Sequence, residues 1–130
     1  MDTVNDKIEI SLPFKAEYVS IVRLTASGVA NRIGFDIDTI EDIKVAVAEV
    51  CNKLVNAGSA DALEYKIVFK MHKERLDIIF DCEDKKLKCI FDKERDQLAL
   101  ALINALMDGA ELCSDTPYLF SMYKVLEGKV

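Results

Sequence analysis

This sequence of 130 residues lacks most of the features that would assign it a chemistry at once. Its four cysteines form no Cys-x-x-Cys pair and it has one histidine, so the spacing typical of metal ligands is absent. The net charge of −6, with no basic stripe, argues against a nucleic-acid backbone as partner. No apolar run is long enough to span a bilayer, and the N-terminal MDTVNDKIEI has neither the basic nor the apolar region of a signal peptide. We therefore expect a cytoplasmic protein that binds no metal ion through a site of its own, no nucleic acid and no membrane.

The sequence does contain enough apolar material for one folded domain. It is 51% hydrophobic and 31% charged, which is a globular composition, and we expect residues 1–130 to form a single domain around one core. In a reducing compartment the four cysteines are predicted to be small core residues. These are Cys51, Cys82, Cys89 and Cys113. His72 lies beside Lys73 in an expected hairpin turn, and we interpret it as a surface residue with no chemical role.

The spacing of apolar residues predicts an order of helices and strands. The predicted elements are a strand over 7–12, helices over 16–33 and 38–56, strands over 63–71, 75–82 and 87–91, a helix over 94–112 and a strand over 118–126. The second helix should begin at Asp38, with Glu41 completing a capping box. The alternation over 63–71 places Leu63 and every second residue after it on the inner face of a hairpin. The three helices should cover one face of a mixed, mostly antiparallel sheet, which gives an α/β (α+β) two-layer sandwich.

Two segments carry a resemblance to a known family. EYVSIVRLTASGVANRIGF followed by IEDIKVAVAEVCN is similar to the first two helices of anti-sigma-factor serine kinases of the RsbW type, and ALMDGAEL is similar to their late helix. Together with the element order, these segments resemble the GHKL (Bergerat) ATPase fold, also called the histidine-kinase-like ATPase fold. The resemblance covers nearly the whole chain, but it is weak between residues 83 and 97. It implies a nucleotide site built from three motifs.

The first motif of the family is a helical glutamate followed four residues later by an asparagine that binds Mg²⁺. Here Glu49 matches the glutamate and is the candidate catalytic residue, but Lys53 stands where the asparagine should be. Asn52 is one residue away, which is a rotation of about 100° on a helix, so it cannot simply replace the missing amide. Asn56 also belongs to the positions that match the site. Lys53 could form an ion pair with Glu49, or its charge could replace Mg²⁺ beside phosphates.

The second and third motifs also depart from the family pattern. Cys82 stands where an aspartate should bind adenine, and Asp84 stands where a glycine should follow it. In the phosphate-binding turn, Ala99 takes the place of a glycine. Glu94 and Asp96 put negative charge at the end of the third helix that should face the triphosphate, which would repel it.

These three changes together favour a regulator that has kept the fold and weakened or lost ATP binding, so that it needs no cofactor. The resemblance then implies protein partners, which are a sigma factor, an anti-anti-sigma protein of the STAS type, or both, with Arg23 matching an arginine used for partner contact. The alternative is an active serine/threonine kinase that uses ATP and Mg²⁺ to phosphorylate a STAS-type antagonist. A third hypothesis is a sensor of an apolar small molecule in the emptied cleft. The simplest interpretation gives Glu49 no role beyond that of a solvated carboxylate with Lys53 as its partner. A homodimer is a further expectation by analogy.

Overall fold

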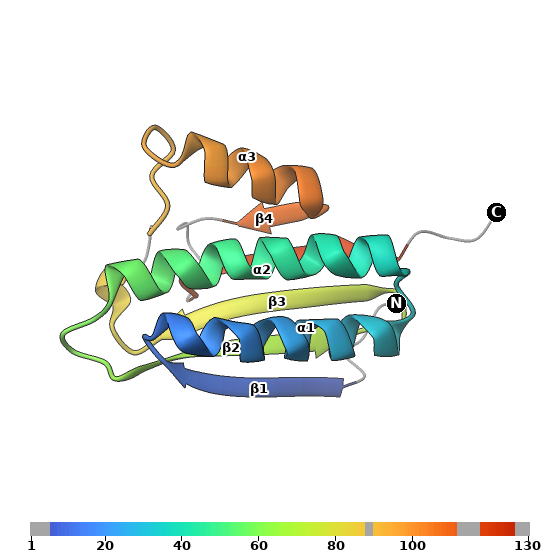
Figure 1. Cartoon of the computed structure of the whole chain (residues 1–130), viewed down its shortest axis with the longest axis horizontal. Coiled ribbons are helices and arrows are strands. Elements are labelled where there is room, and N and C mark those ends of the chain that lie inside the picture. The colour runs from blue at the N-terminus through green and yellow to red at the C-terminus, as the bar shows by residue number, and fades with distance from the viewer. Residues whose placement is uncertain (1–5, 88–89, 112–117, 127–130) are drawn as a thin grey trace.

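The computed structural model describes residues 6–87, 90–111 and 118–126. Its five strands form one sheet in the order β1-β2-β3-β5-β4, and all four pairings are antiparallel (Figure 1). The strands are β1 (Asp6–Pro13), β2 (Glu64–Met71), β3 (Arg75–Cys82), β4 (Gly109–Glu111) and β5 (Phe120–Val125). The helices are α1 (Val19–Ile33), α2 (Ile37–Ala57) and α3 (Gln97–Leu106), and two short 3₁₀ turns are η1 (Ala16–Tyr18) and η2 (Lys85–Leu87).

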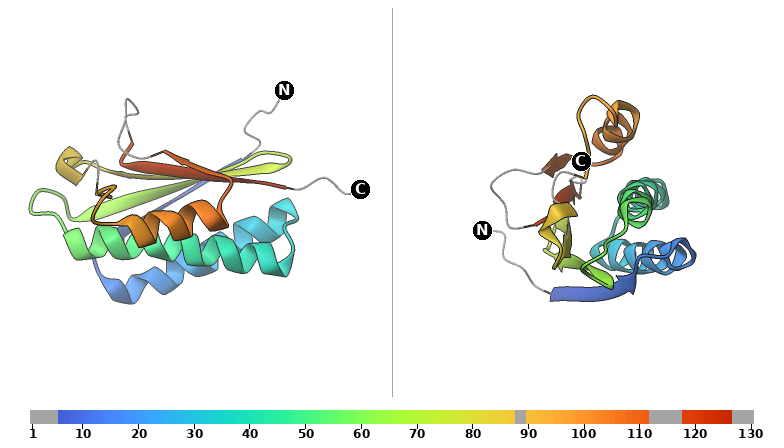
Figure 2. Two further views of the ribbon diagram at one scale, coloured as in Figure 1. Left: turned by 90° about the horizontal axis from the view of Figure 1, so that it is seen from above. Right: turned by 90° about the vertical axis from the view of Figure 1, so that its left-hand side faces the viewer.

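The molecule has two layers, as the sequence predicts. Figure 2 shows the three helices on one face of the sheet, and α2 lies between α1 and α3. The core lies between the layers, where Phe69, Ile78 and Met122 are in register across β2, β3 and β5 and are almost fully buried. The predicted two-layer sandwich with three helices on one face is therefore confirmed.

The start of α2 differs from the prediction by two residues. Asp36 has the extended backbone of an N-cap, and its Oδ1 accepts a hydrogen bond from the backbone N–H of Thr39 at 2.8 Å. Asp38 therefore lies inside the first turn and does not cap the helix. Glu41 does not complete a capping box either, because it forms an ion pair with Lys44. Gly34, with a φ of 114°, makes the left-handed turn that ends α1 and lets this cap form.

The predicted third helix over 94–112 is too long at both ends. Residues before Gln97 form a turn in which Asp92 Oδ1 accepts the backbone N–H groups of Glu94 and Arg95. The helix ends at Leu106, and Gly109–Glu111 forms the short strand β4, which the sequence analysis missed. A Cβ atom at position 109 would lie 2.3 Å from the Tyr123 ring, so any larger residue would force this ring to move.

The predicted strand over 87–91 is also wrong for the residues that the structure describes. Leu87 ends the 3₁₀ turn η2, and Ile90 and Phe91 are buried but belong to no strand. Their apolar character serves the core directly, since Phe91 packs against Phe120 with ring centroids 5.2 Å apart. A short stretch rich in apolar residues can thus be buried by a loop as well as by a strand.

Several single-residue predictions can be compared with the structure. Leu63 lies before β2 and is 90% exposed, so its placement on the inner face was wrong. His72 was predicted to be a surface residue, but its side chain is mostly buried and Nε2 lies 2.7 Å from Asp77 Oδ2. Cys51 and Cys82 are buried free thiols, which confirms their core role. Cys89 and Cys113 lie outside the described residues. Among the helices described here, none has the length and apolar content needed to cross a membrane.

Candidate functional site

A cleft of about 390 Å³ lies where the resemblance places the nucleotide, at the C-terminal end of α2. Its lining residues are Lys53, Asn56, Ala57, Lys86, Leu87, Ile90 and Arg95. They come from α2 and from the segment that connects β3 to α3. Three of the seven are cationic and none is acidic, although the whole chain carries a net charge of −6. Two of these cations are paired with carboxylates outside the lining, Lys53 with Asp96 and Lys86 with Asp61.

Lys53, the residue at the metal-binding position of the family motif, is held by an ion pair. Lys53 Nζ lies 2.8 Å from Asp96 Oδ1, and the side chains are only 26% and 13% exposed. The other oxygen of Asp96 accepts the backbone N–H of Asp92 at 2.7 Å. The hydrogen bond from Asp92 and the one from Lys53 both lower the pKa of Asp96. The expected pairing of Lys53 with Glu49 is wrong, because the better-oriented partner comes from the turn before α3.

Glu49 remains without an assigned partner in the described part of the chain. It is half-buried on α2, one turn before Lys53, and makes no hydrogen bond or ion pair to any described residue. Asn52 is exposed, and only Asn56 contributes an amide to the lining of the cleft. The candidate catalytic carboxylate is thus present, but Lys53, and not an amide, stands four residues after it.

The donor set beside Glu49 does not fit a magnesium ion. Mg²⁺ takes oxygen ligands in near-octahedral geometry. Lys53 is a donor without a lone pair while it is protonated, and its ammonium group is already bound to Asp96.

The residues matched to the adenine motif lie at the other end of the site. Cys82 faces the helices, as predicted, and its thiol lies 3.6 Å from the carbonyl oxygen of Glu64, to which it donates. Burial raises the pKa of this thiol. A neutral thiol of this kind is a weak hydrogen-bonding group, so it is a poor replacement for an aspartate that recognises an amino group.

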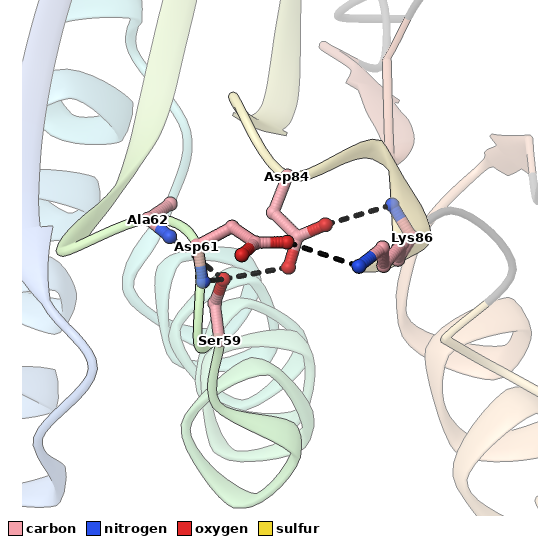
Figure 3. A network of polar contacts seen from close by, with 5 residues as sticks. All are labelled: Ser59, Asp61, Ala62, Asp84 and Lys86. Atoms are coloured by element: carbon pink, nitrogen blue, oxygen red, sulfur yellow. Dashed lines mark hydrogen bonds and ion pairs between the residues drawn. The ribbon is translucent and has the colours of Figure 1, made fainter.

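Asp84, at the position of a family glycine, is a mostly buried carboxylate with two partners of its own. Figure 3 shows Oδ2 accepting the Ser59 hydroxyl at 2.6 Å and Oδ1 accepting the backbone N–H of Lys86 at 3.1 Å. The hydrogen bond from Ser59 is the main reason that the pKa of Asp84 lies below its usual value. The carboxylate is therefore committed to contacts within the protein.

The same contacts join two loops that are far apart in the sequence. Ser59 Oγ also accepts the backbone N–H groups of Asp61 and Ala62, and Lys86 Nζ lies 3.1 Å from Asp61 Oδ2 (Figure 3). The loop after α2 is thus tied to the loop after β3. Ser59 and Asp61 could not be recognised from the sequence as part of the site, because a contact over 25 residues leaves no local pattern.

The last two predicted site residues lie apart from each other. Ala99 is partly buried on α3 and packs against the core, so no bare backbone faces the cleft at that position. Arg23 is exposed on α1, which lies on the opposite side of α2 from α3 (Figure 1). It does not belong to the cleft.

The fold and the position of the cleft define a class of protein. The profile of the histidine kinase-like ATPase domain matches residues 12–117, which is most of the chain. The serine-protein kinase RsbW of a Bacillus cereus strain is 38% identical over 138 residues, which cover 94% of this chain and 86% of the relative. RsbW of Bacillus thuringiensis subsp. konkukian shows the same identity and coverage. The chain belongs to the histidine kinase-like ATPase family and, within it, to the RsbW type.

Proposed function

We propose that this protein is an anti-sigma-factor-like regulator of a partner-switching system that acts by binding proteins and has weakened or lost ATP binding. The observation that carries the proposal is the ion pair between Lys53 and Asp96. It occupies the place that the family resemblance gives to the metal-binding amide and to the phosphate-facing end of the third helix. The protein itself supplies both charges there.

Binding of Mg-ATP at this place would have to break the ion pair. A triphosphate that approached Lys53 would meet the carboxylate of Asp96, and the two negative charges repel by about 1 kcal/mol at contact in water and by more where water is scarce. Magnesium would meet an ammonium group in place of an amide oxygen. Phosphoryl transfer depends on positioning and charge stabilisation, so these two changes affect its main requirements.

The adenine end supports the same proposal. A base that entered there would find the thiol of Cys82, and beside it a carboxylate of Asp84 already bonded to Ser59. Taking the Ser59 hydroxyl away from a mostly buried carboxylate would leave an acceptor without its partner, which is unfavourable. The residues matched to the adenine motif and to the metal-binding amide are therefore already engaged in contacts within the chain.

Partner binding is supported by the surface of α1. Ile21 and Leu24, three residues apart on one face of the helix, are 47% and 72% exposed there, and Arg23 is exposed on the same helix. Exposed apolar residues beside an arginine are typical of the centre of a protein interface. The family resemblance makes a sigma factor or a STAS-type protein the partner to test on this surface.

The direct test is a titration with Mg-ATP. A ligand at a hundredfold excess over its dissociation constant stabilises the native state by about 2.7 kcal/mol, and this raises the melting temperature. We expect no shift for this protein at millimolar Mg-ATP, and a clear shift for an RsbW relative that binds ATP, measured in parallel. A comparable shift in both proteins would refute the loss of ATP binding.

One observation favours the alternative of an active serine/threonine kinase that uses ATP and Mg²⁺. Glu49 is retained, half-buried, and has no partner among the described residues, as a catalytic carboxylate would need. Incubation with labelled ATP and a STAS-type partner separates the two functions, because only the kinase incorporates phosphate. Co-purification of a sigma factor or STAS protein without phosphate incorporation supports the binding regulator, and recovery of neither partner contradicts it.

A further inference from the structure

A second hollow lies between helix α3 and the edge strand β4, which run beside each other (Figure 1). Its volume is about 390 Å³, and its wall consists of Lys93, Gln97, Leu100, Ala101, Ile103, Asn104 and Ala110. We call it the α3–β4 hollow. It shares no residue with the cleft around Lys53, so the two are separate places on the molecule.

The α3–β4 hollow is elongated along the helix. Gln97, Ala101 and Asn104 follow one another at steps of four and three residues, so they lie on one side of α3. From Gln97 to Asn104 the helix rises by about 10 Å, and Lys93 lies four residues further out in the turn before it. Ala110 of β4 forms the opposite wall. The hollow therefore suits a ligand that is longer than it is wide.

The floor of the α3–β4 hollow is apolar. Ile103 is 1% exposed, and Leu100 and Ala110 are partly buried and pack against the main core. Ala101, at the edge of this floor, is a small side chain that leaves the space beside it open. A concave apolar floor with a few polar groups at its rim is the usual form of a small-molecule site. A hydrocarbon chain is the part of a ligand that would gain most from this floor.

The polar groups at the rim are all free to bind a ligand. The side chains of Lys93, Gln97 and Asn104 make no hydrogen bond or ion pair with any residue that the structure describes. An ammonium group can only donate, whereas the two amides can donate and accept. Lys93 and Gln97 lie together at one end, and both can donate to the same carboxylate. This end of the hollow therefore favours an anionic head group.

The acidic residues near the α3–β4 hollow do not oppose an anion there. The chain has 23 acidic residues against 17 basic ones, yet no residue of the wall is acidic. Asp96 is bound to Lys53, and Asp108 Oδ2 accepts the backbone N–H of Val125. Glu111 follows Ala110 in β4 but lines a different hollow, and Glu94 is exposed outside the wall. A carboxylate that enters meets the charge of Lys93 and no anion in the wall.

We propose that the α3–β4 hollow binds a small amphipathic carboxylic acid, with its hydrocarbon chain on Leu100, Ile103 and Ala110 and its carboxylate held by Lys93 and Gln97. This site is distinct from the emptied cleft in which the sequence suggested an apolar ligand. It is also independent of the function proposed above, because it shares no residue with the cleft and needs no nucleotide. A titration with Mg-ATP therefore tests the proposed function without testing this site.

Calorimetric titration of the full chain with sodium octanoate, sodium hexanoate and octan-1-ol tests the class of ligand. We expect saturable binding of octanoate to a single site. Hexanoate should bind about 4- to 15-fold more weakly, since it lacks two CH₂ groups that the floor would bury. Octan-1-ol should bind about fivefold more weakly than octanoate, because it has no charge for Lys93. The absence of saturable octanoate binding, or equal binding of the alcohol, would overturn the proposal.

Two matched variants test the place of binding. Ala101→Phe puts a ring into the hollow and should weaken octanoate binding by about 10-fold or more. Ala105→Phe is the control, since Ala105 is an exposed alanine of the same helix outside the wall, and it should leave the affinity unchanged. Lys93→Met should lower the affinity for octanoate to that for octan-1-ol, without changing the binding of the alcohol. Equal affinities of the two phenylalanine variants would overturn the proposal.

Nuclear magnetic resonance locates the ligand without any substitution. Octanoate should shift the backbone amide signals of Gln97, Asn104 and Ala110 more than those of Lys53 and Asn56, which line the cleft. This measurement decides the place of binding even if a new side chain at position 101 turns away from the hollow. Larger shifts around the cleft than around the α3–β4 hollow would refute the assignment.

Discussion

Helices α2 and α3 are both rich in apolar residues, yet α2 is packed inside the helical layer and α3 is mostly exposed at its edge. α2 lies between α1 and α3 and buries seven of its 21 residues, whereas α3 buries one of ten. On its inner side α3 packs through Ile103 and a few partly buried apolar residues, and a polar contact holds each end: the Lys53–Asp96 ion pair at its start, and Lys124 Nζ donating to the carbonyl oxygen of Leu106 at its end. α2 is therefore part of the scaffold, and α3 is an attachment whose position depends on a few specific bonds.

The largest expected difference in stability is between two isoleucine-to-alanine substitutions, one in each helix. Ile43→Ala and Ile103→Ala both remove a buried isoleucine, at 0% and 1% exposure. We expect Ile43→Ala to lower the free energy of unfolding by about 2–5 kcal/mol, because its surroundings are packed on all sides. The loss for Ile103→Ala should lie at or below the low end of that range, since the mostly exposed α3 can shift to close the cavity. Urea denaturation measures both, and equal losses would show that α3 is as much a part of the core as α2.

The edge strand beside α3 gives a second, smaller contrast. Gly109→Ala would push a methyl group into the Tyr123 ring, and we expect it to destabilise the protein by about 1–3 kcal/mol. Gly28→Ala is the matched control in α1, where a new methyl group meets no atom within 4 Å. It should stabilise the protein by about 0.5–1 kcal/mol, because alanine is the better helix former. A neutral Gly109→Ala would mean that β4 moves easily away from β5.

The ion pair that anchors α3 should have an intermediate effect. Lys53→Met leaves the carboxylate of Asp96 without its cationic partner, and we expect a loss of about 1–2 kcal/mol, since the pair is only partly buried. Hydrogen exchange should rise in α3 more than in α2. Uniform exchange across both helices would contradict the anchoring role of the pair.

The same variant has a characteristic pH dependence. The pKa of Asp96 in the folded state lies below its ordinary value of 3.8, so its stabilising contribution is present above that pH and is lost as the pH falls through the folded-state pKa. Wild type and Lys53→Met should therefore differ in stability at neutral pH and converge in acid below pH 3.8. A difference that stays constant in acid would show that the lysine stabilises by packing and not by its charge.

The sequence predicts the bounds of α2, β2 and β3 better than those of α3, and the reason is physical. In α2, β2 and β3 fully buried positions recur at helical or strand spacing among more accessible ones, so their periodicity shows in the sequence. The run 97–106 is apolar on nearly all sides, so it contains no signal for where α3 begins or ends. The partner of Lys53 was equally hidden, because Glu49 is its neighbour on the helix whereas Asp96 is 43 residues away. Cys82 was placed correctly on the inner side, since strand alternation alone determines that.

The smallest effects concern the polar network at the other end of the cleft. Ser59→Ala removes the hydroxyl that donates to the mostly buried Asp84, and we expect it to lower the free energy of unfolding by about 1 kcal/mol. Lys86→Met removes only an ion pair with Asp61 whose side chains are 82% and 58% exposed, so its effect should be about 0.5 kcal/mol or less. Thermal denaturation of both variants measures the contrast. If Lys86→Met had the larger effect, the exposed ion pair, and not the buried carboxylate, would be what joins the two loops.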